Sequence, residues 1–109
     1  MALTAKTLNT VQEMPVALTT LYTTPGATTT RVTEILLCNN AGAVRTVTIH
    51  FVDSGGAAGD DNAIAKAWDL PQGMPVPLAL NTYLDTGDFI RGIASGADVA
   101  IRISGLEEA

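Results

Sequence analysis

Short runs of alternating apolar and polar residues, separated by turn residues, recur along this chain and constrain its fold more than any other feature. In residues 43–52 (AVRTVTIHFV), Val47, Ile49 and Phe51 fall on one side of an extended chain, with polar residues between them. Residues 97–105 (ADVAIRISG) repeat this alternation near the carboxyl end. A period of two is the geometry of a β-strand with one buried face, so both segments are predicted as strands.

The other predicted strands follow the same logic. They are residues 15–24 (PVALTTLYTT), 31–40 (RVTEILLCNN), 62–70 (NAIAKAWDL) and 76–80 (VPLAL), together with strands on both sides of a turn in residues 82–96 (TYLDTGDFIRGIASG). Turn residues such as Gly, Pro, Asn and Asp separate the runs. The spacing predicts one all-β domain, a single antiparallel β-sandwich resembling a jelly roll, with about seven or eight strands.

The first dozen residues precede the strand pattern. Leu3, Leu8 and Val11 are apolar residues set among Thr, Lys and Asn, too sparse to form a core by themselves. We therefore expect an extended N-terminal arm over residues 1–12 and the β-sandwich domain over residues 13–109. Ordering such an arm costs roughly 1–2 kcal/mol per residue, so it must gain contacts from a neighbouring subunit or another protein surface; a frayed terminus without a role is the alternative.

Composition restricts the core and the partners. Only five residues are aromatic (one Trp, two Tyr and two Phe), so the core must be built from Val, Ile, Leu and Ala. The formal charge of −5, without any run of Lys and Arg, argues against a nucleic-acid partner, which needs clustered cations. No apolar run approaches the ~20 residues of a membrane span, so no membrane partner is expected. The single cysteine, Cys38, excludes an intramolecular disulfide and suits a reducing compartment.

Residues 31–40 depart from simple alternation because both faces of this predicted strand carry apolar side chains. Ile35 and Leu37 share one face, while Leu36 and Cys38 share the other. A strand covered by its own core on one side and by a neighbouring subunit on the other has this pattern, and so does a central strand with a bulge. The sequence leaves both interpretations open.

The sequence offers few residues for catalysis or metal binding. His50 and Cys38 are predicted to be a surface histidine and a core cysteine rather than a catalytic pair. Asp53, Asp60 and Asp61 share a glycine-rich loop, but their order departs from that of a calcium-binding loop. We therefore expect a mobile surface connection there, with no metal, no cofactor and no catalytic residues, in a protein that is not an enzyme.

The order of these features resembles that of small all-β virion proteins of tailed bacteriophages. The matching segments are VTEILLCNN, RTVTIHFVD, a Gly/Asp-rich loop, LPQGMPVPL, YLDTGDFIRGIAS and the terminal VAIRISGLEE. The resemblance implies a sandwich module that assembles on phage heads, necks or tails. It implies a structural role and brings no catalytic residues.

On this basis we expect a capsid decoration, or cement, protein that is made in the host cytoplasm, lies on the outer surface of the virion head and bridges copies of the major capsid protein. A homo-oligomer is expected, and a trimer would match the three-fold positions of a capsid. The alternatives are a head-to-tail (neck) or tail component and a carbohydrate-binding β-sandwich module. The residues predicted to contact other subunits or the capsid are Leu3, Leu8, Val11, Leu36 and Trp68.

Overall fold

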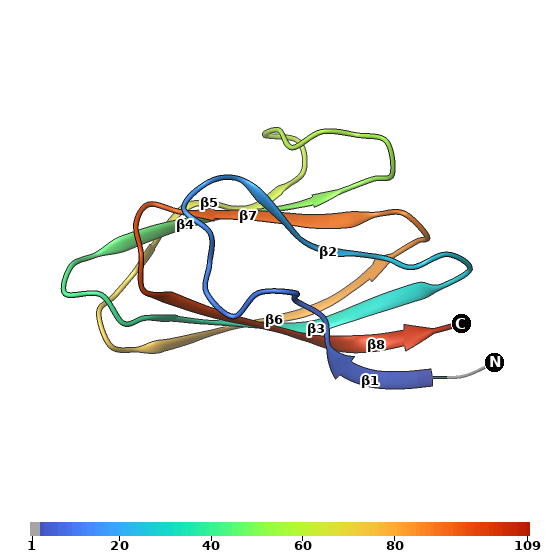
Figure 1. Ribbon diagram of the computed structural model, residues 1–109, viewed down its shortest axis with the longest axis horizontal. Coiled ribbons are helices and arrows are strands. Elements are labelled where there is room, and N and C mark those ends of the chain that lie inside the picture. The colour runs from blue at the N-terminus through green and yellow to red at the C-terminus, as the bar shows by residue number, and fades with distance from the viewer. Residues whose placement is uncertain (1–2) are drawn as a thin grey trace.

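The computed structural model describes residues 3–109 and confirms the all-β prediction. Its strands are β1 (Leu3–Thr7), β2 (Thr19–Thr23), β3 (Thr29–Asn39), β4 (Arg45–Val52), β5 (Ala63–Leu70), β6 (Pro75–Leu84), β7 (Phe89–Ala94) and β8 (Val99–Glu108). The strands form two layers (Figure 1). Within residues 3–109 the structure has no helix that would be able to cross a membrane.

The strand order is that of a jelly roll. Sheet I has the order β1-β8-β3-β6 and sheet II the order β2-β7-β4-β5. The antiparallel pairs are β1–β8, β2–β7, β3–β6 and β4–β5. They are nested: the first strand pairs with the last, the second with the second-last, and so on to the middle of the chain. Folding one long antiparallel hairpin over on itself produces this nesting, which is the jelly-roll arrangement of eight strands in two sheets. The predicted sandwich and its strand count are therefore confirmed.

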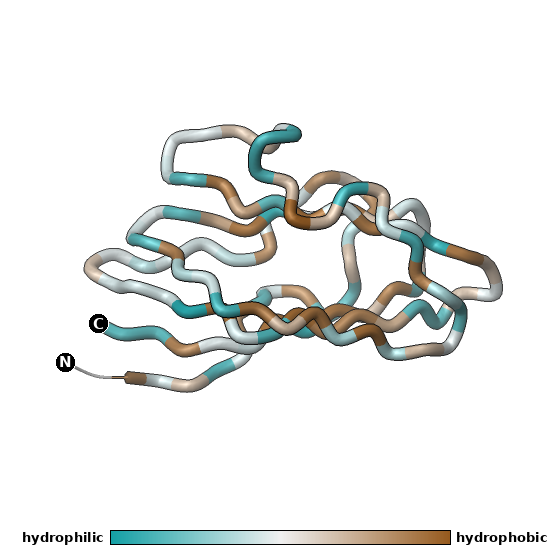
Figure 2. The backbone as a smooth tube through the Cα atoms, turned by 180° about the vertical axis from the view of Figure 1, so that it is seen from behind, coloured by the Kyte–Doolittle hydropathy of each residue, from teal (hydrophilic) through white to brown (hydrophobic). Residues whose placement is uncertain are grey.

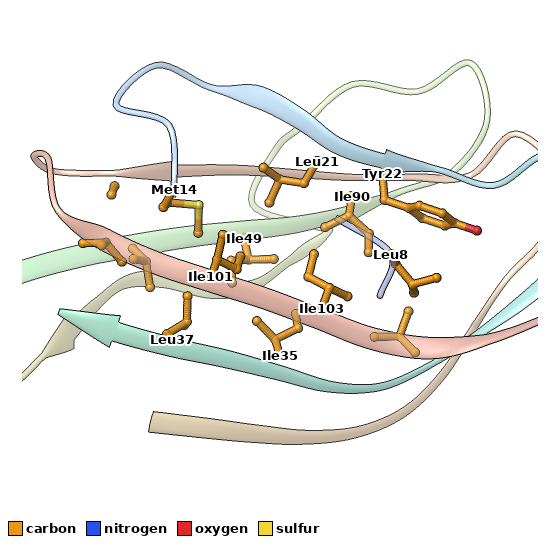
Figure 3. Close-up of a cluster of buried hydrophobic side chains, with 14 of the residues drawn as sticks. Leu8, Met14, Leu21, Tyr22, Ile35, Leu37, Ile49, Ile90, Ile101 and Ile103 are labelled. Carbon is orange, nitrogen blue, oxygen red and sulfur yellow. The ribbon is translucent and has the colours of Figure 1, made fainter. Parts of the chain in front are cut away.

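The core lies between the two sheets and is almost entirely aliphatic, as the composition predicts. Figure 3 shows Ile35 and Ile103 pointing into this space from sheet I, and Ile49 and Ile90 from sheet II. Figure 2 shows the hydrophobic residues concentrated along the strands and hydrophilic residues at many of the turns. The buried core residues are Leu8, Met14, Leu21, Tyr22, Val32, Ile35, Leu37, Val47, Ile49, Leu70, Leu84, Ile90, Ala94, Val99, Ile101 and Ile103.

A bulge in β3 brings Val32 and Ile35, three residues apart, onto the same inner face. The pairing of β3 shifts register between Val32 and Glu34 in both of its ladders. Beyond the bulge, Ile35 and Leu37 are fully buried in the core, whereas Cys38 points outward and is only partly buried. The bulge is therefore confirmed, and cover of the outer face by a neighbouring subunit stays a prediction. The prediction of a core cysteine is wrong, because Cys38 shares the outer face with Leu36, opposite the buried Ile35 and Leu37.

The predicted arm lies against the sandwich. Residues 3–7 form the edge strand β1, which pairs with β8 in unbroken register, and residues 1–2 lie outside the described part of the chain. Leu8 is 4% exposed and belongs to the core, and its backbone N–H donates to the Ile103 carbonyl at 2.7 Å. The Asn9 side-chain oxygen accepts from the Ile103 N–H at 2.8 Å. The expectation that Leu8 waits for a partner is wrong, since its side chain is already buried by this chain.

His50 is also buried, so the prediction of a surface histidine is wrong. The loop of residues 53–62 lies on the side of sheet II that faces away from sheet I (Figure 1). His50 Nδ1 lies 3.1 Å from the Gly59 carbonyl and 2.8 Å from Asn62 Oδ1. Asn62 Oδ1 accepts from the Gly59 N–H, and Asn62 Nδ2 donates to the Ala57 carbonyl. This orientation of the amide makes His50 Nδ1 the donor, and these bonds hold the loop over the sheet.

A polar link joins the two sheets beside the core. The Tyr22 hydroxyl, from sheet II, lies 2.7 Å from Thr30 Oγ1 and donates to the Glu107 carboxylate, both in sheet I. Lys6 Nζ lies 3.4 Å from the same carboxylate. Burial first, and then the negative Glu107, raise the pKa of Tyr22 to about 12.

This raised pKa gives an expected pH dependence. The folded state keeps Tyr22 neutral up to about pH 12, whereas the unfolded chain ionises near its ordinary value of 10.0. The stabilisation is therefore complete below pH 10 and is lost as pH rises toward 12. Urea midpoints measured across this window should fall less steeply for Tyr22→Phe than for the native chain. Tyr83→Phe is the matched control and should keep the native slope; an equal alkaline loss in Tyr22→Phe would contradict the assignment.

Candidate assembly surface

The residues considered for chemistry lie apart in the structure. Cys38 projects from the outer face of sheet I, while His50 lies under the loop on sheet II. Asp60 is 2.8 Å from Lys66 Nζ, whose hydrogen bond and charge lower the pKa of the Asp60 carboxyl. In the part of the chain that the structure describes, no group of three or more His, Cys, Asp or Glu side chains could hold a metal ion. These residues do not form a common site.

The aromatic residues do not form a platform for stacking a sugar. Tyr22 is buried in the core, and Trp68 is half-buried and packs against the core from β5. Tyr83 is 62% exposed, on the outer side of β6 in the other sheet. Carbohydrate recognition usually requires exposed aromatic faces that lie together. The structure therefore gives the carbohydrate-binding alternative no support.

The outer face of sheet I carries apolar side chains that no other part of the described chain covers completely. Residues paired across an antiparallel ladder point to the same side, so Leu36 lies between Arg102 of β8 and Pro77 of β6. An open hollow of about 330 Å³ occupies this end of the face. It is lined by Gln12, Leu36, Cys38, Pro75, Ala100, Ile101 and Arg102.

A second hollow, of about 210 Å³, lies at the other end of the same face. Tyr83 and Leu3 both line this hollow and are largely exposed to solvent, at 62% and 64%. Arg31 crosses between them and donates from Nε to Asn81 Oδ1 at 2.8 Å. The residues lining this hollow are Leu3, Thr29, Arg31, Tyr83, Leu106 and Glu108.

The charges on this outer face nearly cancel, unlike those of the chain as a whole. The paired registers place two cations, Arg31 and Arg102, and two carboxylates, Glu34 and Glu108, on it, and the exposed Glu13, bridged to Ala100, adds a third carboxylate at its edge. The formal sum is therefore −1, whereas the whole chain carries −5. A nearly neutral, partly apolar face can approach another protein with less repulsion than an acidic surface would meet. The outer face of sheet I is the candidate assembly surface.

The opposite face of the sandwich differs in character. Thr46 and Thr48 point outward from β4, and Thr48 Oγ1 accepts from the Ala67 N–H at 3.0 Å. Beyond them, the loop of residues 53–62 covers His50 and Val52. This side therefore mixes hydroxyl groups and a loop with Phe89, Arg91 and Ile93 of β7, which are paired with Val52, His50 and Thr48.

Two of the five predicted contact residues lie on the candidate assembly surface. Leu3 is at one end and Leu36 at the other. Val11 is 37% exposed in the segment between β1 and β2, Leu8 lies in the core, and Trp68 packs against the core. That these residues contact other subunits or a capsid stays a prediction, except for the buried Leu8.

Sequence reasoning missed two residues of the candidate assembly surface, Tyr83 and Leu106. A signal existed for Leu106, because it shares its side of the strand with the polar residues Arg102 and Ser104. An apolar residue on the polar side of a strand indicates a covered outer face. Tyr83 similarly follows Asn81 on the outer side of β6.

Comparison with known proteins identifies a shared fold. No family model matches the chain, and no curated protein matches its sequence. Among solved structures, it is similar to a chain in the structure of infectious bursal disease virus, Gt strain, with a TM-score of 0.51 and 11% sequence identity. The match covers 97% of this chain and 29% of the viral chain, so this chain spans less than a third of that chain's length. At this identity the likeness concerns the fold alone: the sandwich described here has a fold that also occurs in a virus structure.

Proposed function

We propose that this chain is a structural protein of a virus particle that decorates the outer surface of a tailed-phage head. The observation that carries the proposal is the partly apolar, nearly neutral outer face of sheet I, on a chain that is otherwise acidic. The likeness of the fold to part of a viral chain and the order of strands and turns in the sequence support it. The proposal includes no catalytic role.

The proposed action is to bridge copies of the major capsid protein. Burying Leu36, Tyr83 and Leu106 against the capsid would contribute roughly 25 cal/mol for each Å² of apolar area removed from water. A protein that binds only the assembled shell stabilises that shell by mass action. Repetition over many sites on one particle then converts a modest affinity into a large resistance to rupture.

Leu36→Glu is expected to weaken attachment to heads at least tenfold, equivalent to about 1.4 kcal/mol. The substitution places a charge at the apolar end of the candidate assembly surface that holds Leu36, where it would be desolvated on binding. Ile64→Glu is the matched control, because Ile64 is 42% exposed on β5 of the other sheet and the charge change is the same. Cosedimentation of each variant with heads that lack this protein gives the affinities.

Equal weakening by both substitutions, or by neither, would contradict the assignment of the outer face of sheet I. Thermal unfolding of each variant must be measured in parallel, so that a loss of binding is not confused with a loss of folding. Antibody labelling of intact virions separates the head position from the neck or tail alternative. Antibody label found only at the neck or tail would contradict decoration of the head and would support the neck or tail alternative.

A further inference from the structure

The four edges of the two sheets are protected to different degrees. On β6, Pro75 and Pro77 carry no backbone N–H, and edge strands tolerate proline where the missing group faces outward. β5 is irregular, with shifts in its register and a positive φ of 48° at Ala67. The edge strand β2 is met by residue Thr10, whose N–H donates to the Leu21 carbonyl at 3.0 Å. Bulges, prolines and covering segments are devices that prevent a further strand from pairing.

Among residues 3–7 the edge strand β1 has no proline, bulge or covering segment, and its charged residue, Lys6, turns to the inner side of the sheet, where its Nζ lies 3.4 Å from Glu107. It contains no proline, it pairs with β8 without any shift, and all five of its residues are exposed. A regular, exposed edge offers a row of unpaired N–H and C=O groups to another strand. The structure therefore leaves one sheet edge, that of sheet I at β1, open to strand addition.

The direction of the backbone groups of β1 follows from one hydrogen bond. The Leu8 N–H donates to the carbonyl of Ile103, its register partner on β8, so Leu8 directs its backbone toward β8. Successive residues of an antiparallel strand alternate in this respect, so Lys6 and Thr4 also face β8. The residues that direct their N–H and C=O groups to the open edge are Leu3, Ala5 and Thr7.

These outward groups match a second copy of the same strand. When two β1 strands run antiparallel with Ala5 opposite Ala5, Leu3 lies opposite Thr7 of the second copy. All the outward residues then lie in hydrogen-bonded pairs, each of which exchanges two bonds. Lys6 lies opposite Thr4 rather than opposite Lys6, so no like charges meet, and the small Ala5 lies on the axis. A shift of the pairing by two residues would leave an outward residue without a partner.

We propose that β1 pairs with β1 of a second copy of this chain about a two-fold axis at Ala5. The two copies of sheet I then form one continuous sheet, and their outer faces join. Leu3 and Ala5 of both copies lie at the centre of the joined face, beside Leu106. Such an interface is isologous and closes as a dimer, in place of the trimer expected from the sequence. The proposal does not depend on attachment to a phage head.

The solution mass of the full-length chain tests the proposal. The native chain is expected to be a dimer by analytical ultracentrifugation, and Ala5→Pro a monomer. Proline at this position removes an N–H that faces the open edge, so the β1–β8 ladder and the melting temperature should be unchanged. Ala5→Ser keeps the N–H and is expected to remain dimeric. A native chain that stays monomeric up to roughly 1 mM, the weak end of the affinity scale, would overturn the proposal, as would a dimer that persists in Ala5→Pro.

Cross-linking tests the register independently. In a Cys38→Ser background, Ala5→Cys places two thiols across the axis at a Cα separation of about 5.5 Å, which a disulfide can span. Thr4→Cys is the control, because its counterpart lies about 8 Å away, two residues out of register. Mild oxidation should link the Ala5→Cys chains and leave the Thr4→Cys chains mostly unlinked. Equal cross-linking of both variants would contradict the proposed pairing.

Discussion

Gly105→Ala is expected to destabilise the protein by about 3 kcal/mol, at the upper end of the cost of overpacking a core. A Cβ at Gly105 would collide with the Arg31 backbone carbonyl and would lie 2.8 Å from Leu8 Cδ1. Arg31 belongs to β3, which is hydrogen-bonded on both sides by β8 and β6 and cannot retreat. The missing side chain is what allows β8 to run close to the bulge of β3 and to the buried Leu8.

Urea unfolding provides the measurement. The midpoint should fall while the slope with denaturant stays constant, which identifies a loss of stability rather than of compactness. Gly42→Ala is the control, because a Cβ there would have no heavy atom within 4 Å. Its effect should remain within about 0.5 kcal/mol. A normal midpoint in Gly105→Ala would mean that β8 can move away from β3 at little cost.

Asn39→Ala is expected to cost about 3 to 5 kcal/mol, because a buried amide connects the two sheets at the end of β3. The Asn39 side chain is fully buried, and its Nδ2 donates to the Ala43 carbonyl at 2.9 Å and to the Leu70 carbonyl at 3.1 Å. Its Oδ1 accepts from the Ala41 N–H at 2.9 Å. Alanine would leave these groups without their partner, at roughly 1–3 kcal/mol for each one that stays dry.

The matched control is Asn81→Ala, since the Asn81 side chain is exposed and bonds only to Arg31 in the described hydrogen-bond network. Its thermal midpoint should lie close to that of the native chain. Asn39→Ala should melt well below both. Equal thermal midpoints for the two variants would contradict the prediction. They would mean that water replaces the buried hydrogen bonds of Asn39 at no cost in stability.

The fold was largely predictable because most strands have one buried face. Residues 62–70 contain enough alanine for a helix, yet Ile64, Trp68 and Leu70 recur at even spacing, and β5 covers this segment. β1 was not predicted as a strand, because all five of its residues are exposed and leave no alternating signal. Its pairing depends on β8, at the other end of the chain, and no local pattern contains that information.

Long-range contacts, which a local pattern does not contain, also explain why the positions of some site residues were predicted wrongly. Leu8 looks isolated beside Thr7 and Asn9 in the sequence, but the fold brings Ile103 next to it. His50 looks exposed on the polar side of its strand, but the following loop returns to cover it. Alternation placed Leu36 and Cys38 together on one face, whereas the bulge that turns Val32 to the other face became visible only in the paired strands.

The nested pairing also determines when the protein can fold during its synthesis. β8 is the last of these eight strands to be synthesised, yet it lies in the interior of sheet I, between β1 and β3. The β4–β5 hairpin can close early, because its ends are near in sequence, whereas β1 must wait for a partner almost a whole chain length away. A nascent chain that lacks β8 therefore exposes the edges of β1 and β3 that β8 later joins. Sheet I can be completed only after β8 has been synthesised, and crowded nascent chains are exposed to mispairing until then.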